Sequence, residues 1–282
     1  MSFDALLPAE MAVRAEQVGV RKANLNLFSM FMLSVLAGAF IALGAIFATT
    51  VMAGASTMLP YGVIRLLGGS VFSLGLILVV VAGAELFTGN NLIVMAWASR
   101  KISTRLLVKN WVVVYFGNFV GSLATAGVMY LTGQFAFGNG AVGLVALTTA
   151  DAKTKLDFVQ AIALGVMCNS LVCLAVWLSY SARSAVDRVV TIIPPIAAFV
   201  TAGFEHSVAN MYFIPIGLLI KAAAPASFWT SIGKTAADYP MLTWDRFFLS
   251  NLLPVTIGNI IGGSIMVGLV YWFVYLRPRP TK

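Results

Sequence analysis

The sequence predicts an all-α, polytopic membrane protein whose six transmembrane helices form two inverted three-helix repeats. Three observations support this fold class. Of the 282 residues, 60% are hydrophobic and 10% are charged, whereas an average soluble domain has roughly 25% charged residues. Six charge-free runs reach about 20 residues, the length needed to cross ~30 Å of hydrocarbon. Two sequence patterns also occur twice, once in each half of the chain.

Residues 1–26 precede the first apolar run and are predicted to form a cytoplasmic amphipathic helix on the membrane surface. Pro8 lies near the start of this helix, and its polar side carries Arg14, Glu16, Arg21 and Lys22. The segment either anchors the chain or gates a pore, and both interpretations stay open.

Residues 27–282 are predicted to form one transmembrane channel domain, with repeat halves at about 27–132 and 157–276. The second and fifth runs are predicted to be broken at the bilayer midplane, at Gly83–Asn91 and at Thr201–His206. The six predicted spans are about Leu27–Val51, Tyr61–Ala98, Leu107–Leu131, Phe158–Tyr180, Val189–Ile220 and Phe248–Tyr275.

The two breaks share a pattern, because AGAELFTGN at Ala82–Asn90 returns as AGFEHSVAN at Ala202–Asn210. The third and sixth runs also match at six positions with identical spacing. These are Asn110, Gly117, Asn118, Gly121, Gly127 and Tyr130, against Asn251, Gly258, Asn259, Gly262, Gly268 and Tyr271. Because each half has an odd number of spans, the second half must be inverted, as in many channels and transporters. The small residues Gly117, Gly121, Gly258, Gly262 and Gly263 allow close helix packing.

Basic residues predict the orientation of the chain. With both termini on one side, 12 of the 18 lysines and arginines share that side, and the positive-inside bias makes it cytoplasmic. The 12 are Arg14, Arg21, Lys22, Arg100, Lys101, Arg105, Lys109, Arg183, Arg188, Arg277, Arg279 and Lys282.

The fifth break holds His206, the only histidine in the chain, beside Glu205. Ionisable groups at bilayer depth are costly and commonly mark a transport pathway. An imidazole can exchange protons near neutral pH. Glu205 either contributes to the pathway or accepts backbone hydrogen bonds at the break. Asn169 and Asn259, within spans four and six, either donate to a passing carboxylate or tie helices together.

Two half-helices are predicted to restart after the breaks, with Thr88 and Ser207 as capping residues. Because the repeats are inverted, both N-termini would point at the bilayer centre, and each carries roughly +0.5 of an elementary charge. This centre favours an anion, with help from Lys153 in the outer loop before span four.

Bulky apolar residues flank both breaks. They are predicted either to form constrictions that exclude water, or to serve as ordinary packing residues. These residues are Phe72, Leu76, Leu86, Phe87, Phe199 and Phe204.

Other functions have little support in the sequence. Cys168 and Cys173 lie about 140° apart around a helix, so they should neither bridge nor share a metal. The basic residues lie between apolar runs, which argues against a nucleic-acid partner. We expect no cofactor and no enzymatic activity. A neutral-solute channel fits the broken repeats, although no Asn-Pro-Ala motif opens either half-helix.

The sequence resembles the formate/nitrite transporter family over nearly its whole length. The resemblance is strongest in four blocks, Gly68–Val94, Lys109–Leu123, Gly203–Pro215 and Leu253–Gly263. It implies a six-span, aquaporin-like protomer in a homopentamer, with one pore per protomer and a central hole filled by membrane lipid.

Position by position, the resemblance assigns roles to residues of this chain. It places the family's Leu-Phe-Thr motif on Leu86, Phe87 and Thr88, and the constrictions on Phe72, Leu76 and Phe199. The central histidine and its glutamate fall on His206 and Glu205. The pore asparagines fall on Asn169 and Asn259, and the outer-vestibule lysine falls on Lys153.

We therefore expect a pH-gated channel for formate and related small monovalent anions in the bacterial inner membrane, with both termini cytoplasmic. An anion crosses apolar rings at high cost. Formate is expected to take a proton, via His206 or water, and to cross as the neutral acid. The shared motifs identify the family but not the substrate, so nitrite and hydrosulfide remain alternatives.

Overall fold

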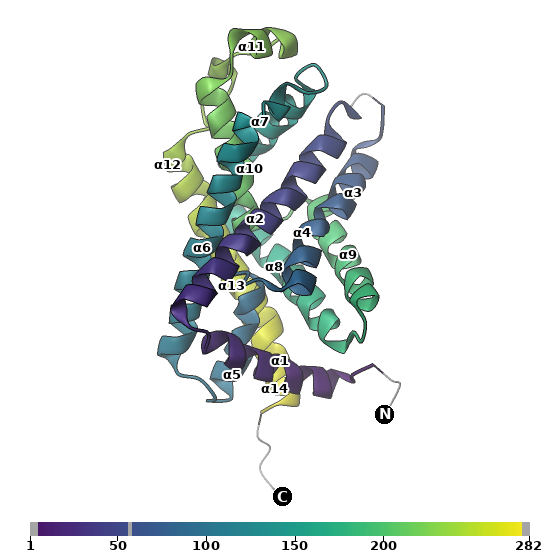
Figure 1. Ribbon diagram of the computed structural model, residues 1–282, viewed down its shortest axis with the longest axis vertical. Helices are drawn as coiled ribbons and strands as arrows, with labels where there is room; N and C mark the ends of the chain where they lie inside the picture. Colours follow the sequence, from purple (N-terminus) through teal and green to yellow (C-terminus); the bar gives the residue numbers. More distant parts are fainter. Residues whose placement is uncertain (1–4, 56–57, 278–282) are drawn as a thin grey trace, which may run out of the picture.

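The computed structural model describes residues 5–55 and 58–277, and these residues form an elongated bundle of helices. The first and last helices, α1 (Pro8–Ala23) and α14 (Val270–Tyr275), lie at one end of the bundle, which we call the terminal end, and α11 (Ala226–Ile232) marks the far end (Figure 1). Residues 1–4 of the predicted N-terminal helix, and Arg279 and Lys282 of the predicted topology, lie outside the described residues.

Six helices in the described part of the chain are long and apolar enough to cross a membrane, as the sequence predicted. Their bounds are α2 (Leu27–Met52), α3 to η2 (Tyr61–Gly83), α6 (Thr104–Leu131), α8 (Phe158–Ser181), α9 (Ala185–Ala202) and α12 to α14 (Trp244–Tyr275). The second of these comprises α3 (Tyr61–Phe72), α4 (Leu74–Ile77) and π-helical η2 (Leu78–Gly83). The last comprises α12 (Trp244–Arg246), η6 (Phe247–Leu252), α13 (Leu253–Ile260), η7 (Ile261–Leu269) and α14 (Val270–Tyr275).

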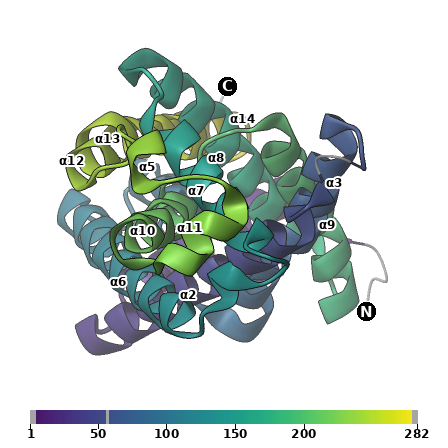
Figure 2. The same cartoon turned by 90° about the horizontal axis from the view of Figure 1, so that it is seen from above.

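Both predicted breaks are present, but the chain restarts differently after each. After the fifth-span break, α10 (Ser207–Ala223) runs for 17 residues among α2, α6, α7 and α13 (Figure 2). After the second-span break there is only a five-residue 3-10 turn, η3 (Gly89–Ile93), and then α5 (Val94–Ala98). A helical segment therefore follows each break, as predicted, but the first runs for ten residues, five of them in 3-10 form, and the second for 17.

The predicted capping residues are also wrong. His206, not Ser207, is the N-cap of α10, and its Nδ1 accepts a hydrogen bond from the Ala209 amide at 3.0 Å. Thr88 occupies the cap position of η3 but makes no side-chain cap there. An imidazole ring nitrogen can serve as the cap acceptor in place of the usual hydroxyl or carboxylate.

Two further helices lie outside the spans. α1 (Pro8–Ala23) is the expected amphipathic helix and lies across the terminal end (Figure 1). α7 (Ala141–Thr154) occupies the segment predicted as a loop, and it packs against α10. Its buried residues Val142, Ala146 and Ala150 recur at helical spacing, a signal that was present in the sequence. Short 3-10 turns complete the chain at η4 (Gln134–Ala136) and η5 (Ala236–Asp238).

Four of the matched glycines, Gly117, Gly121, Gly258 and Gly262, do allow close helix contacts, as predicted. A Cβ atom at Gly121 would lie 2.0 Å from the Val35 carbonyl oxygen, and one at Gly258 would lie 2.2 Å from the Ile162 carbonyl oxygen. In this way α2 approaches α6, and α8 approaches α13, in corresponding parts of the two repeats.

We expect Gly121→Ala to lower the stability of the protein by at least about 1–3 kcal/mol, because the new methyl group overlaps backbone. Thermal melting of the purified protein in detergent measures the effect. Gly127→Ala is the matched control on the same helix, since a Cβ there meets nothing within 4 Å. Equal melting temperatures for both variants would contradict the close contact.

Candidate functional site

The two helix breaks meet at a hydrogen bond between Thr88 and His206. Thr88 Oγ1 lies 2.9 Å from His206 Nε2, and both residues are buried. His206 Nδ1 already accepts the Ala209 amide hydrogen, so this nitrogen carries no proton. The imidazole is therefore the neutral Nε2–H tautomer, and it donates to the Thr88 hydroxyl. That donation leaves the hydroxyl hydrogen of Thr88 able to turn toward a substrate.

Each break is fixed by an asparagine from the third span of its own repeat. Asn259 Oδ1 accepts from the Ser207 amide at 2.9 Å, and its Nδ2 donates to the carbonyls of Gly165 (2.8 Å) and Glu205 (3.0 Å). The matching bonds in the first repeat join Asn118 to Phe87 N (2.9 Å), Ser34 O (2.8 Å) and Glu85 O (2.9 Å). These amides satisfy backbone groups that the breaks would otherwise leave unpaired.

A Lys–Glu–Asn network supports each break. Lys153 Nζ contacts Glu205 Oε1 at 2.7 Å, and Asn210 Nδ2 donates to Glu205 Oε2 at 2.6 Å. The equivalent contacts are Lys22 Nζ to Glu85 Oε1 at 2.9 Å and Asn90 Nδ2 to Glu85 Oε2 at 2.7 Å. In each network the amide Nδ2 also donates to a further asparagine, Asn251 or Asn110.

These contacts change the interpretation of two predicted residues. The carboxylate of Glu205 accepts from side-chain amides and an ammonium group, not from the backbone. The charge of Lys153 is paired with Glu205, so this lysine contributes little net positive charge to its surroundings. Lys22 was missed by the sequence reasoning as a site residue, since the surface prediction for α1 gave no reason to place it at a break.

We expect Lys153→Met to destabilise the protein by about 3–5 kcal/mol, because it leaves the Glu205 carboxylate buried without its partner. Adding Glu205→Gln should recover part of this loss, since the unpaired charge is then gone. Melting temperatures of both single variants and the double variant form the cycle that measures the coupling. Additive losses would show that the ion pair has no energetic role.

Asn169 is fully committed to bonds within the protein. Its Nδ2 lies within hydrogen-bonding distance of Thr88 O (3.2 Å), Asn91 Oδ1 (2.9 Å) and Asn259 O (2.7 Å). Asn259 likewise has all its donors engaged. Of the two interpretations left open, this arrangement favours the one in which both amides tie helices together around Thr88.

Two cavities lie at the breaks, one lined by Leu86 and Gly89 on either side of Thr88, and the other by His206. We call the one of about 450 Å³ the terminal cavity; it is lined by Leu76, Leu86, Glu85 and Lys22, among others. It also receives three arginines that the sequence reasoning did not single out, namely Arg14, Arg21 and Arg188. The far cavity, of about 50 Å³, is lined by Arg65, Phe72, Lys153, Phe199, Phe204, His206, Asn210 and Phe213, among others.

The predicted constriction residues separate into three groups. Phe72 and Phe199 pack edge to face at 5.7 Å beside the far cavity. Leu76 and Leu86 line the terminal cavity. Phe87 lines neither cavity, and its ring packs against Tyr115 (4.9 Å) and Trp111. Its position in the motif therefore serves packing of the break against α6.

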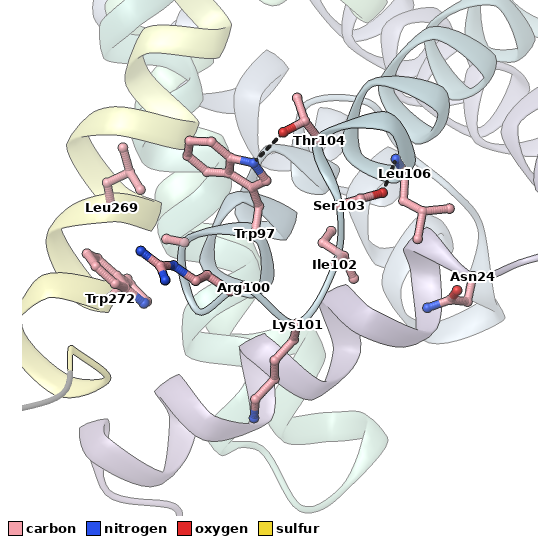
Figure 3. Close-up of a pocket in the computed structure, with 11 residues that line it drawn as sticks. Asn24, Trp97, Arg100, Lys101, Ile102, Ser103, Thr104, Leu106, Leu269 and Trp272 are labelled. Carbon is pink, nitrogen blue, oxygen red and sulfur yellow. Dashed lines mark hydrogen bonds between the residues drawn. The ribbon is translucent and has the colours of Figure 1, made fainter.

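A further recess, of about 870 Å³, contains none of the predicted site residues (Figure 3). It is a recess at the terminal end around Arg100 and Ile102, and Trp97 Nε1 donates to Thr104 Oγ1 across it at 3.0 Å. Within the described ranges, no group of three or more His, Cys, Asp or Glu side chains is placed to hold a metal ion.

Comparison with known proteins gives the same family as the sequence motifs. Residues 9–273 match the formate/nitrite transporter family. The formate channel FocA of Escherichia coli K12 is 50% identical, covering 98% of this chain and 96% of the relative, and FocA of Haemophilus influenzae is 44% identical, covering 95% and 94%. A solved structure described as a pentameric formate channel with formate bound is 50% identical. It superposes with a TM-score of 0.85, covering 89% of this chain and 98% of that chain.

Proposed function

Because the chain belongs to the formate/nitrite transporter family, and is therefore a channel or transporter and not an enzyme, we propose that it conducts formate across a membrane. The buried Thr88–His206 pair carries the proposal. It is the polar point at which the two breaks meet: His206 itself lines the far cavity, and residues on either side of Thr88 line the terminal cavity. The relatives named as formate channels support formate as the substrate.

The apolar side chains around the Thr88–His206 pair determine the protonation state in which formate crosses. A bare carboxylate that leaves water without a compensating charge is strongly disfavoured, whereas formic acid needs only hydrogen bonds. The substrate therefore crosses between Phe72 and Phe199 on one side, and Leu76 and Leu86 on the other, as the neutral acid.

The neutral imidazole of His206 carries one ring proton, on Nε2, and losing that proton would leave an imidazolate anion. Protonating Nδ1 would break the bond that caps α10. Formate therefore takes its proton from water before it passes the apolar residues. His206 orients the Thr88 hydroxyl, and Thr88 donates to the substrate carbonyl oxygen. Of the two proton sources considered from the sequence, His206 and water, we therefore propose water.

The proposal extends to assembly and location. The chain is proposed to form a homopentamer in the bacterial inner membrane, with one pore per protomer and membrane lipid in the central hole. The pentameric description of the solved relative supports the assembly. The excess of basic residues at the terminal end supports cytoplasmic termini. In this orientation α1 covers the cytoplasmic entrance of the terminal cavity, and residues 27–282 form the channel domain.

Uptake of labelled formate into proteoliposomes tests the proposed function. We expect saturable uptake that is absent from empty vesicles, with weaker competition by nitrite, hydrosulfide and acetate at equal concentration. Stronger competition by nitrite or hydrosulfide would reassign the substrate within the family. Osmotic swelling in glycerol without formate uptake would replace the proposal with a neutral-solute channel.

A further inference from the structure

The recess around Arg100 lies at the level where two membrane spans end. Thr104, which lines the recess, is the first residue of the third span, and Leu269 and Trp272 lie near the end of the sixth (Figure 3). Apolar spans stop where the lipid headgroups begin, and tryptophan is enriched at this depth. The recess therefore opens at the height of the headgroups, in the leaflet on the terminal side of the membrane.

Two tryptophan rings form fixed walls of this recess. Trp97 Nε1 donates to Thr104 Oγ1 at 3.0 Å. Trp272 Nε1 donates to Ser99 Oγ, also at 3.0 Å. Because both indole N–H groups are engaged within the protein, the rings offer apolar surface to an occupant, and Leu269 continues that surface. The walls therefore suit a ligand that has an apolar part.

Arg100 is the open cation of the recess. Its guanidinium extends toward Trp272 (Figure 3), and no hydrogen bond or ion pair joins its side chain to another residue of the described ranges. Lys101 extends the other way, toward α1, where it is paired with Glu16. None of the described residues that line the recess is acidic. The recess therefore carries an uncompensated positive charge, which favours an anionic group.

The backbone of Arg100 has a conformation that is unusual for arginine. Its φ of 59° lies in the left-handed region, which only Asn139 shares among the described residues other than glycine. Arg100 N donates to Trp97 O at 2.8 Å, and Lys101 N donates to Ala96 O at 2.9 Å. In this pattern of bonds glycine usually holds the left-handed position, because a side chain there has an energetic cost. An arginine in place of glycine indicates a role for its guanidinium.

We propose that this recess binds the headgroup of an anionic phospholipid from the surrounding leaflet. The guanidinium of Arg100 donates to the phosphate oxygens, which arginine can contact with two parallel hydrogen bonds. The two indole rings and Leu269 contact the glycerol and the first acyl carbons. Ile265 and Met266, which are exposed one turn before Leu269, then support the acyl chain. Basic recesses between spans are typical sites for anionic headgroups.

Native mass spectrometry of the purified protein in detergent tests the site, because it resolves each bound lipid. We expect phosphatidylglycerol to bind saturably, and phosphatidylcholine, which has no net charge, to bind more weakly. Arg100→Gln should raise the dissociation constant of phosphatidylglycerol about tenfold to hundredfold, as the loss of a hydrogen bond to a charged group implies. Arg105→Gln is the matched control. It removes the same charge from an exposed position in the first turn of α6 and should leave the constant unchanged.

Arg100→Gly separates lipid binding from folding. Glycine suits the left-handed backbone, so the lipid-free variant should melt no lower than wild type, yet bind phosphatidylglycerol as weakly as Arg100→Gln. If Arg100→Gln does not fold, this variant replaces it in the titration.

Glycerol phosphate distinguishes a membrane source from a soluble one, because it has the phosphate without the acyl chains. It should not displace phosphatidylglycerol at equal concentration, and displacement would assign the recess to a soluble phosphate. Equal binding of the two lipids, an equal loss in Arg105→Gln and Arg100→Gln, or unchanged binding in both Arg100 variants would each overturn the inference. A changed number of subunits in the spectrum of Arg100→Gln would overturn it as well, and would assign the recess to contact with a second copy of the chain.

Discussion

Asn259→Leu is expected to leave no folded, transport-competent protein. Leucine has similar volume but removes the partners of two buried backbone groups at the break, the Ser207 amide and the Glu205 carbonyl, together with a second bond to the Gly165 carbonyl within α8. Each orphaned group costs about 1–3 kcal/mol. The combined loss is a large part of the about 5–15 kcal/mol that holds a typical domain folded. Fluorescence-detected gel filtration of the detergent extract measures the folded yield.

Two further variants make this result specific. Asn118→Leu removes the matching bonds in the first repeat and should cause a similar loss. Gln160→Leu makes the same amide-to-leucine change at an exposed position and should be harmless. A monodisperse peak with normal uptake for Asn259→Leu would show that the breaks do not depend on these amides.

Thr88→Val is expected to lower formate uptake by about tenfold while the protein remains folded. Valine keeps the shape of threonine but removes the hydroxyl, so His206 Nε2–H loses its acceptor and the substrate loses its donor. One hydrogen bond contributes about 0.5–1.5 kcal/mol, and about 1.4 kcal/mol corresponds to a tenfold change. Initial rates in proteoliposomes measure the effect.

Thr88→Ser is the matched control, because serine retains the hydroxyl and should keep most of the uptake. Melting temperatures of the two variants check that neither change acts through the fold. Equal uptake by Thr88→Val and wild type would remove Thr88 from the pathway, and with it the role proposed for the Thr88–His206 pair.

Much of this architecture could be predicted from the sequence because the two halves of the chain carry the same patterns. Apolar runs defined the spans, and the repeated patterns around Ala82 and Ala202 located both breaks to within a few residues. His206 was identified because it is a single histidine in an apolar run. Burying an imidazole in a membrane is costly, so such a residue commonly has a functional role. The structure then places His206 against Thr88, a contact between residues 118 positions apart.

The incorrect predictions concern positions where the two repeats have the same sequence spacing but different local structure. Thr88 and Ser207 follow their breaks similarly, yet one restart is a 3-10 turn and the other is a 17-residue helix capped by His206. Lys153 was read as a free cation because its partner Glu205 is 52 residues away. The same reasoning left Lys22 on the membrane surface, although it binds Glu85 across 63 residues. Pairing of this kind depends on tertiary structure that spacing cannot supply.

Formate uptake under a clamped membrane potential tests the central claim, that the substrate crosses the apolar residues as the neutral acid. Proteoliposomes with valinomycin and a potassium gradient fix the potential, while the internal and external pH are set independently. Neutral-acid crossing predicts uptake that follows the pH gradient and does not change when the potential is reversed at equal pH. Uptake that rises or falls with the imposed potential at equal pH would show that the formate anion itself crosses, and would contradict the account.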